Sequence, residues 1–313
     1  MAEKPRLLIL GGAGYIGARL ADALSDQYEV FVTYRGLPPA REGWLRKTGI
    51  SALRFDAASD ERLPFDCQFD AVLNLAMPGA SEAQKDPKGT QLHALRIANL
   101  LATLAASGGL RRLIHFSSFH VYGAEAGRET FTEADVARPQ HPYGTNHLIC
   151  EEKIHEITLD ELFILRPTNI IAAPAYDELG PQSKLFFLSL CRQAAQSGSI
   201  KLENDGLSYR DFIGFSDVLA AVRIVLTHRK AGAQLFNLSA GSACRLDTFA
   251  ETIHKSAVKL LGNDIGLSFG SGIDSWRRPF VVCNQRLRTL GWEPQGKLIA
   301  EIDATLAFFA GKE

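Results

Sequence analysis

A glycine-rich turn follows the first apolar run of the chain. Residues 6–10 read Arg-Leu-Leu-Ile-Leu, and Gly11-Gly-Ala-Gly14-Tyr-Ile-Gly17 comes directly after them. Glycines at this spacing allow a tight turn, close approach of the backbone to a pyrophosphate and close packing of a helix on a strand. The N–H groups at the start of the following helix attract phosphate, so the loop predicts a dinucleotide site. The residues expected to contact the dinucleotide here are Gly11, Gly14, Tyr15, Ile16 and Gly17.

The end of the second expected strand indicates which dinucleotide is bound. An NAD site typically has an acidic residue about 20 residues after the loop, and this residue binds the ribose 2′-hydroxyl. Here the strand ends in Thr33-Tyr34-Arg35, with no carboxylate among these residues. An acid repels a 2′-phosphate, whereas an arginine binds it through a forked contact. We therefore expect NADP, with Tyr34 and Arg35 in its site, and NAD as the alternative.

Two further motifs resemble those of a known family. Residues 116–123 read Phe-Ser-Ser-Phe-His-Val-Tyr-Gly, and residues 141–147 read His-Pro-Tyr-Gly-Thr-Asn-His. With the glycine loop and the later runs at 166–169, 209–213 and 290–294, they resemble the extended short-chain dehydrogenase/reductase family. This is the group of sugar-nucleotide epimerases, dehydratases and reductases, and the resemblance covers nearly the whole chain. It implies that Asp56 and Ala76 also contact the cofactor.

The resemblance implies a reaction at a carbinol carbon. In the family, a tyrosine gives or takes the proton that accompanies hydride transfer, and a serine binds the substrate oxygen. These residues correspond to Tyr143 and Ser118 in this chain. Oxidising an alcohol removes a proton together with a hydride, so a positioned phenol suits this chemistry.

The chain departs from the family pattern at His147. The family motif is Tyr-x-x-x-Lys, and its fifth position is a histidine here. Residues i and i+4 share one face of a helix, so we expect His147 to point toward the nicotinamide ribose, as the lysine does. A histidine, with an ordinary pKa of about 6.5, keeps the hydrogen bond but not the full charge that lowers the pKa of the tyrosine. Three outcomes stay open. The enzyme is less active, or its chemistry needs less help from Tyr143, or the protein is a non-catalytic relative.

His120 lies two residues after Ser118, on the same side of an extended chain. In some family members the residue at this place is an acid/base for epimerisation. Dehydratases of the family have an Asp–Glu pair at the places of Phe119 and His120, which argues against a dehydratase. His120 is thus a candidate for catalysis or for a polar substrate contact. The remaining histidines, His93 and His115 among them, lack metal-ligand spacing and are interpreted as ordinary.

The second half of the chain has residues that match the family's binding site for a nucleoside diphosphate sugar. Asn169 matches an asparagine on the diphosphate or sugar, and Arg210 matches an arginine on the diphosphate. Arg278, or its neighbour Arg277, is near the place of a second such arginine, although Pro-Phe-Val follows where the family has x-Gly-Asp. Two guanidinium groups suit a pyrophosphate. The alternative is structural ion pairing with an aspartate such as Asp274.

Apolar runs alternate with helical patterns over the first half of the chain. Strands are expected at 6–10, 29–33, 71–75, 112–116 and 162–165, and helices at 15–24, 93–106 and 143–157. This alternation predicts an α/β fold with a Rossmann-like, doubly wound parallel sheet. We expect a dinucleotide-binding domain over 1–172, to which the chain returns around 211–240. A smaller α/β substrate lobe is expected over 173–210 and 241–313, with a helix at 184–196 and turns at 204–206 and 270–272.

Composition limits the class of partner. The 313 residues include 34 Lys or Arg and 35 Asp or Glu, a net charge of −1, which excludes nucleic-acid binding by bulk charge. No apolar run reaches the roughly 18 residues of a membrane span. Five cysteines without a CxxC pair argue against disulfides and zinc, so we expect no metal and a cytoplasmic protein. The resemblance implies a homodimer that pairs through the helices at 93–106 and 143–157.

Three functions compete at this point. The first is NADPH-dependent reduction of a keto group on a nucleoside-diphosphate sugar, with Tyr143 as proton donor and Ser118 binding the carbonyl oxygen. The second is an epimerase that retains its cofactor, although this class usually has NAD and an acid after the second strand. The third is a non-catalytic nucleotide-binding relative, which the missing lysine supports.

Overall fold

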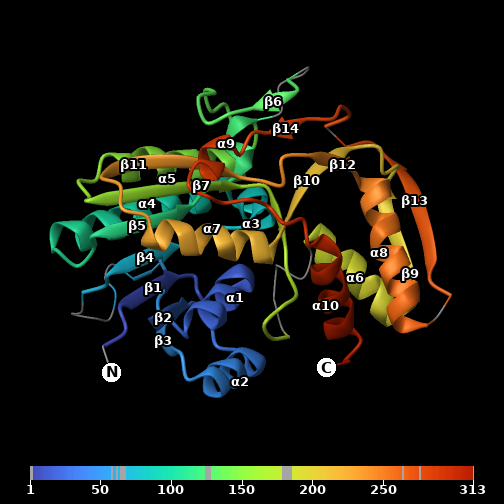
Figure 1. Cartoon of the computed structure of the whole chain (residues 1–313), viewed down its shortest axis with the longest axis horizontal. Helices are drawn as coiled ribbons and strands as arrows, with labels where there is room; N and C mark the ends of the chain where they lie inside the picture. The colour runs from blue at the N-terminus through green and yellow to red at the C-terminus, as the bar shows by residue number, and fades with distance from the viewer. Residues whose placement is uncertain are drawn as a thin grey trace.

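A computed structural model describes residues 3–57, 59–60, 63, 68–123, 128–177, 185–262, 264–274 and 276–312. In this part of the chain, a central sheet has the strand order β11-β7-β5-β4-β1-β2-β3, and every neighbouring pair is parallel (Figure 1). The strands are β1 (Arg6–Leu10), β2 (Glu29–Tyr34), β3 (Ser51–Arg54), β4 (Ala71–Asn74), β5 (Arg112–Phe116), β7 (Glu161–Pro167) and β11 (Gly232–Leu238). The order reverses between β1 and β4, so the sheet is doubly wound, as predicted.

Helices cover both faces of this sheet. On one face lie α1 (Tyr15–Leu24) and α7 (Phe215–Thr227), and on the other lie α4 (Pro87–Ala106) and α5 (Pro142–His155). Successive side chains of a strand point to opposite faces. Leu7 and Ile9 therefore belong to the core under α1 and α7, while Leu8 and Leu10 belong to the core under α4 and α5. Burial on both faces explains why β1 is a continuous apolar run.

A second region lies beside the sheet, at the right of Figure 1. A small sheet there joins β8 (Asn169–Ile171), β10 (Tyr209–Gly214) and β12 (Ala243–Arg245), and a parallel pair joins β9 (Ser199–Asn204) and β13 (Gly266–Gly272). The helices α6 (Phe186–Ser197), α8 (Leu246–Leu261) and α10 (Leu298–Phe309) pack together beside them. The remaining short elements are α2 (Pro39–Thr48), α3 (Ala80–Lys85), η1 (Phe119–Tyr122), β6 (Thr130–Phe131), β14 (Val281–Val282) and α9 (Gln285–Arg288).

The chain returns to the central sheet through α7 and β11, and β11 pairs with β7. The buried apolar cluster under α1 continues without interruption into α6 and α8. The proposed boundaries between a cofactor domain and a substrate lobe therefore stay predictions.

The expected strands and helices of the first half are confirmed with small changes at their ends. The helix expected from residue 93 begins earlier, at Pro87, because the carboxylate of Asp86 accepts a hydrogen bond from the N–H of Gly89 and caps it. The helix expected at 184–196 is α6, and residue 184 lies outside the described residues. The start of α4 depends on a capping side chain, and the spacing of apolar residues gives no information about caps.

The turn expected at 270–272 is wrong. These residues lie in β13, where a Cβ atom on Gly270 would be 2.2 Å from the carbonyl oxygen of Glu203 on the neighbouring strand. The glycine is needed for close approach of two strands, not for a turn. The turn expected at 204–206 is confirmed, since Gly206 follows the end of β9 with a left-handed φ of 74°.

Candidate active site

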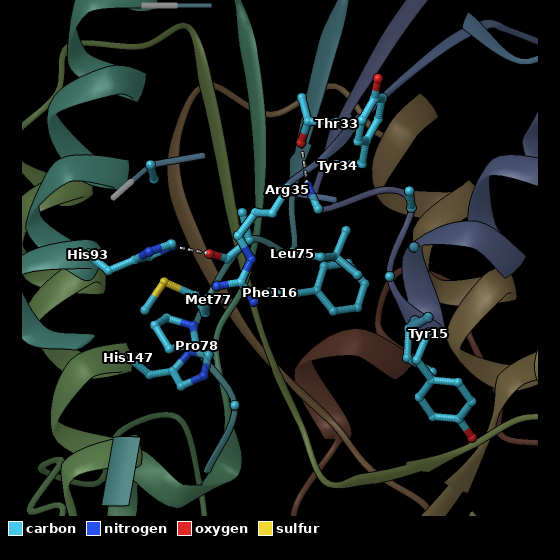
Figure 2. A pocket seen from close by; sticks show the side chains of 18 of the residues that line it. Tyr15, Thr33, Tyr34, Arg35, Leu75, Met77, Pro78, His93, Phe116 and His147 are labelled. Carbon is cyan, nitrogen blue, oxygen red and sulfur yellow. Dashed lines mark hydrogen bonds between the residues drawn. The ribbon is translucent and has the colours of Figure 1, made fainter. Parts of the chain in front are cut away.

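A cavity of about 320 Å³ opens at the carboxyl ends of the central strands, where the strand order reverses between β1 and β4. Doubly wound sheets bind their ligands at this place. Figure 2 shows His93 and His147 approaching it from α4 and α5, with Tyr15 on the opposite side, from α1. The other residues lining the cavity include Gly11, Gly14, Ile16, Gly17, Thr33, Tyr34, Arg35, Arg41, Phe55, Ala57, Ala76, Met77, Phe116, Ser117, Tyr143 and Ile170.

The glycine loop forms the tight turn that its spacing predicts. Gly11 has a left-handed φ of 72°, and its N–H donates to the Thr33 hydroxyl oxygen at 2.8 Å. A Cβ atom on Gly17 would lie 2.6 Å from the carbonyl oxygen of Gly11, so helix α1 and the loop touch only because residue 17 is glycine. Gly14 is the N-cap of α1, and neither an acid in its first turn nor a side-chain cap competes for the N–H groups there. These N–H groups are available to phosphate oxygens.

Tyr15 contributes the face of its ring to the cavity, and its hydroxyl points away from it (Figure 2). The hydroxyl donates to the carbonyl oxygen of Ala172 at 2.5 Å and accepts from the Ala172 N–H at 2.9 Å. Burial raises the pKa of Tyr15 far above its usual range, so it stays a neutral phenol. Tyr15 thus ties the start of α1 to the chain that leaves β8.

Arg35 lines the cavity at the end of β2 and meets a carboxylate that the sequence did not predict. Its Nη1 lies 3.2 Å from Oε1 of Glu82, a residue of α3, and both side chains are about half exposed. The carboxylate that is missing from the sequence at the end of β2 is therefore present in the structure, but Glu82 of α3 provides it. Exposed pairs of this kind contribute little to stability.

Ala76 and Asp56 differ in their relation to the cavity. Ala76 lines it; its N–H donates to Oδ1 of Asn74 at 3.1 Å, and its carbonyl oxygen is 2.8 Å from Nε2 of His93. His93 was interpreted from the sequence as ordinary, yet it lines the cavity and holds this turn in place. Asp56 is not among the lining residues, although its neighbours Phe55 and Ala57 are.

Tyr143 lies in the first turn of α5 and lines the cavity. Burial raises the pKa of its hydroxyl above the usual range, and a hydrogen bond with Ser118 opposes this effect. Ser118 is the N-cap of η1, where its Oγ accepts from the His120 N–H at 3.2 Å. The structure thus brings Ser118 and Tyr143 together, as the resemblance implies, while Ser117 rather than Ser118 is among the lining residues.

His147 lies one turn after Tyr143, and the two rings meet edge to face with centroids 4.7 Å apart. It is 3% exposed, and neither ring nitrogen has a hydrogen-bond partner among the described residues. Burial, with His115 and His120 nearby, lowers the pKa of His147 well below its usual range. The ring is therefore neutral, with one N–H donor and one acceptor nitrogen to offer.

His120 also lies beside Tyr143, with ring centroids 5.6 Å apart, and the rings of Phe119 and His141 are each 5.9 Å from it. Burial, together with the charges of His141 and Arg210, lowers the pKa of His120 to about 4. It does not line the cavity described above. A neutral histidine here can accept a hydrogen bond from a substrate hydroxyl.

The residues expected to bind the diphosphate are largely engaged with protein. The Asn169 side-chain amide donates to the carbonyl oxygen of Asp211 at 2.8 Å, and Nη2 of Arg210 lies 2.5 Å from Oδ2 of Asp274. The alternative of a structural ion pair is thus the one seen for Arg210. Arg277 forms a forked pair with Asp205, at 2.7 and 2.9 Å. Arg278 is exposed and is not brought to the cavity.

Within the ranges that the structure describes, no group of three His, Cys, Asp or Glu side chains is arranged to hold a metal ion. Within the same ranges, the helices are too short or too polar to cross a membrane.

Comparison with known proteins places this geometry in context. The model of a family described as the NAD dependent epimerase/dehydratase family matches residues 7–239. The dTDP-6-deoxy-L-talose 4-dehydrogenase (NAD(P)(+)) of Kitasatospora kifunensis is 26% identical over 94% of this chain and 92% of that protein. The GDP-6-deoxy-D-mannose reductase of Pseudomonas aeruginosa is 28% identical over 79% of each chain. The solved UDP-N-acetylglucosamine 4-epimerase from Methanobrevibacter ruminantium M1 superimposes with a TM-score of 0.81 over 99% of both chains, at 19% identity.

Proposed function

Because the chain belongs to the NAD dependent epimerase/dehydratase family, we propose that it reduces a keto group on a nucleoside-diphosphate sugar with NADPH. Its curated relatives include a dTDP-6-deoxy-L-talose 4-dehydrogenase (NAD(P)(+)), a GDP-6-deoxy-D-mannose reductase and a UDP-glucose 4-epimerase. The chain is accordingly an NAD(P)-dependent oxidoreductase or epimerase of this type. Our proposal adds to this that the reaction is a reduction, that NADPH is the cofactor, and that single residues have the roles given below.

The cavity fits a nicotinamide dinucleotide. The glycine loop and the uncapped start of α1 suit the pyrophosphate, since a side chain at Gly17 would collide with the loop. Arg35, Tyr143 and His147 all line this cavity. In the proposal, Arg35 would bind the 2′-phosphate of NADPH, and Tyr143 and His147 would bind the ribose at the nicotinamide end. The bound cofactor would supply the hydride. The protein's own part is to hold the sugar and move the proton.

The contact between Tyr143 and His147 is the observation that favours reduction over epimerisation. Since His147 is neutral, it does not lower the pKa of Tyr143 as a lysine charge would, and burial raises that pKa. Tyr143 therefore keeps its proton and is suited to donate it to the oxygen of a carbonyl group. Ser118 would bind the same oxygen. An epimerase must first take a proton from a hydroxyl, for which a tyrosinate is needed.

The Arg35–Glu82 pair favours a second candidate, an epimerase that retains NAD. The Glu82 carboxylate lies beside the residue that would bind the adenosine ribose, and a carboxylate at that place suits a free 2′-hydroxyl. In this alternative the hydride returns to the same sugar, and no cofactor is consumed.

An experiment with NADPH that carries deuterium in place of the transferred hydride distinguishes the two functions, because the position of the deuterium in the product can be followed. With a 4-keto nucleotide sugar, a reductase consumes one NADPH for each product and leaves deuterium on the carbinol carbon. An epimerase instead interconverts two hydroxyl sugars without net loss of cofactor. Tight NADPH binding without either reaction would identify a non-catalytic relative.

We also propose that residues 1–172 bind the cofactor, that 173–210 and 241–313 bind the sugar, and that the protein is a cytoplasmic homodimer. The helices α4 and α5 pack against each other on one face of the sheet, and Leu92 of α4 is 49% exposed. An apolar side chain at that place suits a contact between two copies of the pair. Sedimentation at micromolar concentration would give the mass of two chains if the helices pair, and of one chain if they do not.

A further inference from the structure

Two buried histidines lie side by side behind the cavity. His115 is on β5 and is 0% exposed, and His147 is on α5 and is 3% exposed. Their ring centroids are 6.5 Å apart, with an angle of 47° between the ring planes. His115 points to the face of β5 that α4 and α5 cover, because it alternates with Ile114 and Phe116 on the other face. Apolar packing alone does not explain why two histidines, whose ring nitrogens need hydrogen-bond partners, are buried here.

Asn74 determines which nitrogen of His115 carries the hydrogen. The Oδ1 atom of Asn74 accepts from the Ala76 N–H at 3.1 Å, so the other end of its amide, Nδ2, is the donor. This Nδ2 lies 2.9 Å from Nδ1 of His115, which must therefore be the acceptor. In the neutral ring, the hydrogen of His115 is then on Nε2. Burial lowers the pKa of His115 to about 4, which keeps the ring neutral.

The Nε2–H of His115 has no hydrogen-bond partner among the described residues. The carboxylate of Glu151, whose charge acts on His115, has one oxygen 2.9 Å from Nε of Arg166 and the other 2.6 Å from Nη2. His147 is the neighbouring ring with an acceptor nitrogen to offer, since both of its nitrogens lack partners among the same residues. A buried donor and a buried acceptor that lie this close gain by pairing, because an unpaired one is costly.

We propose that His115 is a positioning residue for His147. Its Nε2–H donates to one nitrogen of His147, directly after a small side-chain adjustment or through one bridging water. His147 then has a single tautomer, and its remaining N–H is available to the ribose of the cofactor. A lysine at this place needs no such partner, since its ammonium group rotates and has three donors. The chain Asn74–His115–His147 thus supplies, by tautomer selection, an oriented N–H donor for the ribose, which the family's lysine supplies with its rotating ammonium group.

The tautomers can be measured directly in the full-length protein. The nitrogen-15 spectrum of histidine-labelled protein at pH 7.5, without ligand, should show His115 with its hydrogen on Nε2 and His147 as one tautomer. Assignment uses the His115→Phe and His147→Lys variants, each of which removes one ring. A wild-type spectrum with the hydrogen of His115 on Nδ1, or with His147 as a mixture of tautomers, would overturn the proposal. In His115→Phe, His147 should become a mixture.

A double-mutant cycle tests the consequence for binding. We expect His115→Phe, which retains a buried ring, to weaken NADPH binding about tenfold, as loss of one buried hydrogen bond does. In the His147→Lys background the same change should alter binding less than twofold, because the lysine has no tautomer to select. Equal losses in both backgrounds would mean that His115 acts only through packing. His155→Phe, at an exposed site on the same helix, is the matched control and should bind like the wild type.

The binding part of this inference rests on the proposed cofactor site, whereas the tautomer part does not. If the spectra show the predicted tautomers but neither NADPH nor NADH binds, the proposed function fails and the histidine pair stands. If NADPH binds normally and the tautomer of His147 is independent of His115, the pair fails alone.

Discussion

Tyr143 and His147 lie one turn apart on α5, and their rings are in edge-to-face contact at 4.7 Å between centroids. This contact replaces the interaction of a phenol with a lysine in the family motif. A neutral ring leaves the proton on Tyr143, whereas a cation at the same place would favour its release. The proposed reduction uses the protonated phenol, which this difference favours.

Tyr143→Phe removes the hydroxyl and little else. We expect the rate of NADPH-dependent reduction to fall by about 10²–10⁴, which is the usual contribution of a positioned acid. NADPH binding, measured by nicotinamide fluorescence, should weaken much less than turnover, by no more than the about tenfold that one hydrogen bond contributes. Tyr28→Phe, which changes a tyrosine just before β2, is the control and should keep full activity. Unchanged turnover in Tyr143→Phe would remove this residue from the mechanism.

His147→Lys restores the charge of the family motif and should change the pH dependence of the reaction. The ammonium group favours the tyrosinate, so the pKa of Tyr143 falls. The maximal rate of reduction with saturating substrates, which needs the protonated phenol, then declines at a lower pH than in the wild type, while the maximal rate of alcohol oxidation rises at neutral pH. Rate profiles in both directions measure this. Identical profiles for the two proteins would contradict an electrostatic role for position 147.

Arg35 and Glu82 should set the choice of cofactor in opposite directions. Arg35→Ala removes the group placed for the 2′-phosphate, and we expect at least tenfold weaker NADPH binding with NADH binding nearly unchanged. Glu82→Gln removes a carboxylate that competes for Arg35 and repels phosphate, so NADPH binding should become tighter. Fluorescence titrations at fixed ionic strength provide both constants. If Glu82→Gln weakens NADH binding instead, the NAD-retaining alternative gains support.

The buried histidines should make the protein less stable in mild acid. The pKa of His115 is about 4 in the folded chain, against about 6.5 for an unfolded histidine. The unfolded chain therefore binds more protons between these values, and the free energy of unfolding falls as pH falls from about 6.5 to about 4. For His115 alone the loss reaches about 3 kcal/mol. His115→Phe should flatten this part of the curve, and replacement of the exposed His155 by Gln should not. Urea unfolding at several pH values measures the slopes.

The architecture around the cavity follows from local patterns. The strands β1 and β5 are short apolar runs next to turn signals, and the loop between β1 and α1 has glycines where the backbone requires them. The same patterns mislead at Gly270, where the glycine serves the approach of two strands. A close approach of distant backbones has no local signature, so it resembles a turn in the sequence.

The site was predicted unevenly. Ser118 and Tyr143 meet as the family resemblance implies, and His147 lies beside Tyr143 as the i, i+4 spacing implies. Glu82, His93 and His115 were not predicted as site residues, since nothing in their own neighbourhood distinguishes them. Their positions depend on the packing of α3, α4 and β5 around the cavity, which only the folded chain establishes.

The place of β11 at the edge of the central sheet has a consequence for the growing chain. All seven residues of β7 are buried, and β11 pairs along the whole of that strand. During synthesis, β7 emerges first, and β8, α6, β9, β10 and α7 must follow before β11 can cover it. Until then, the nascent protein exposes an apolar strand edge, the kind of surface that promotes aggregation and attracts chaperones.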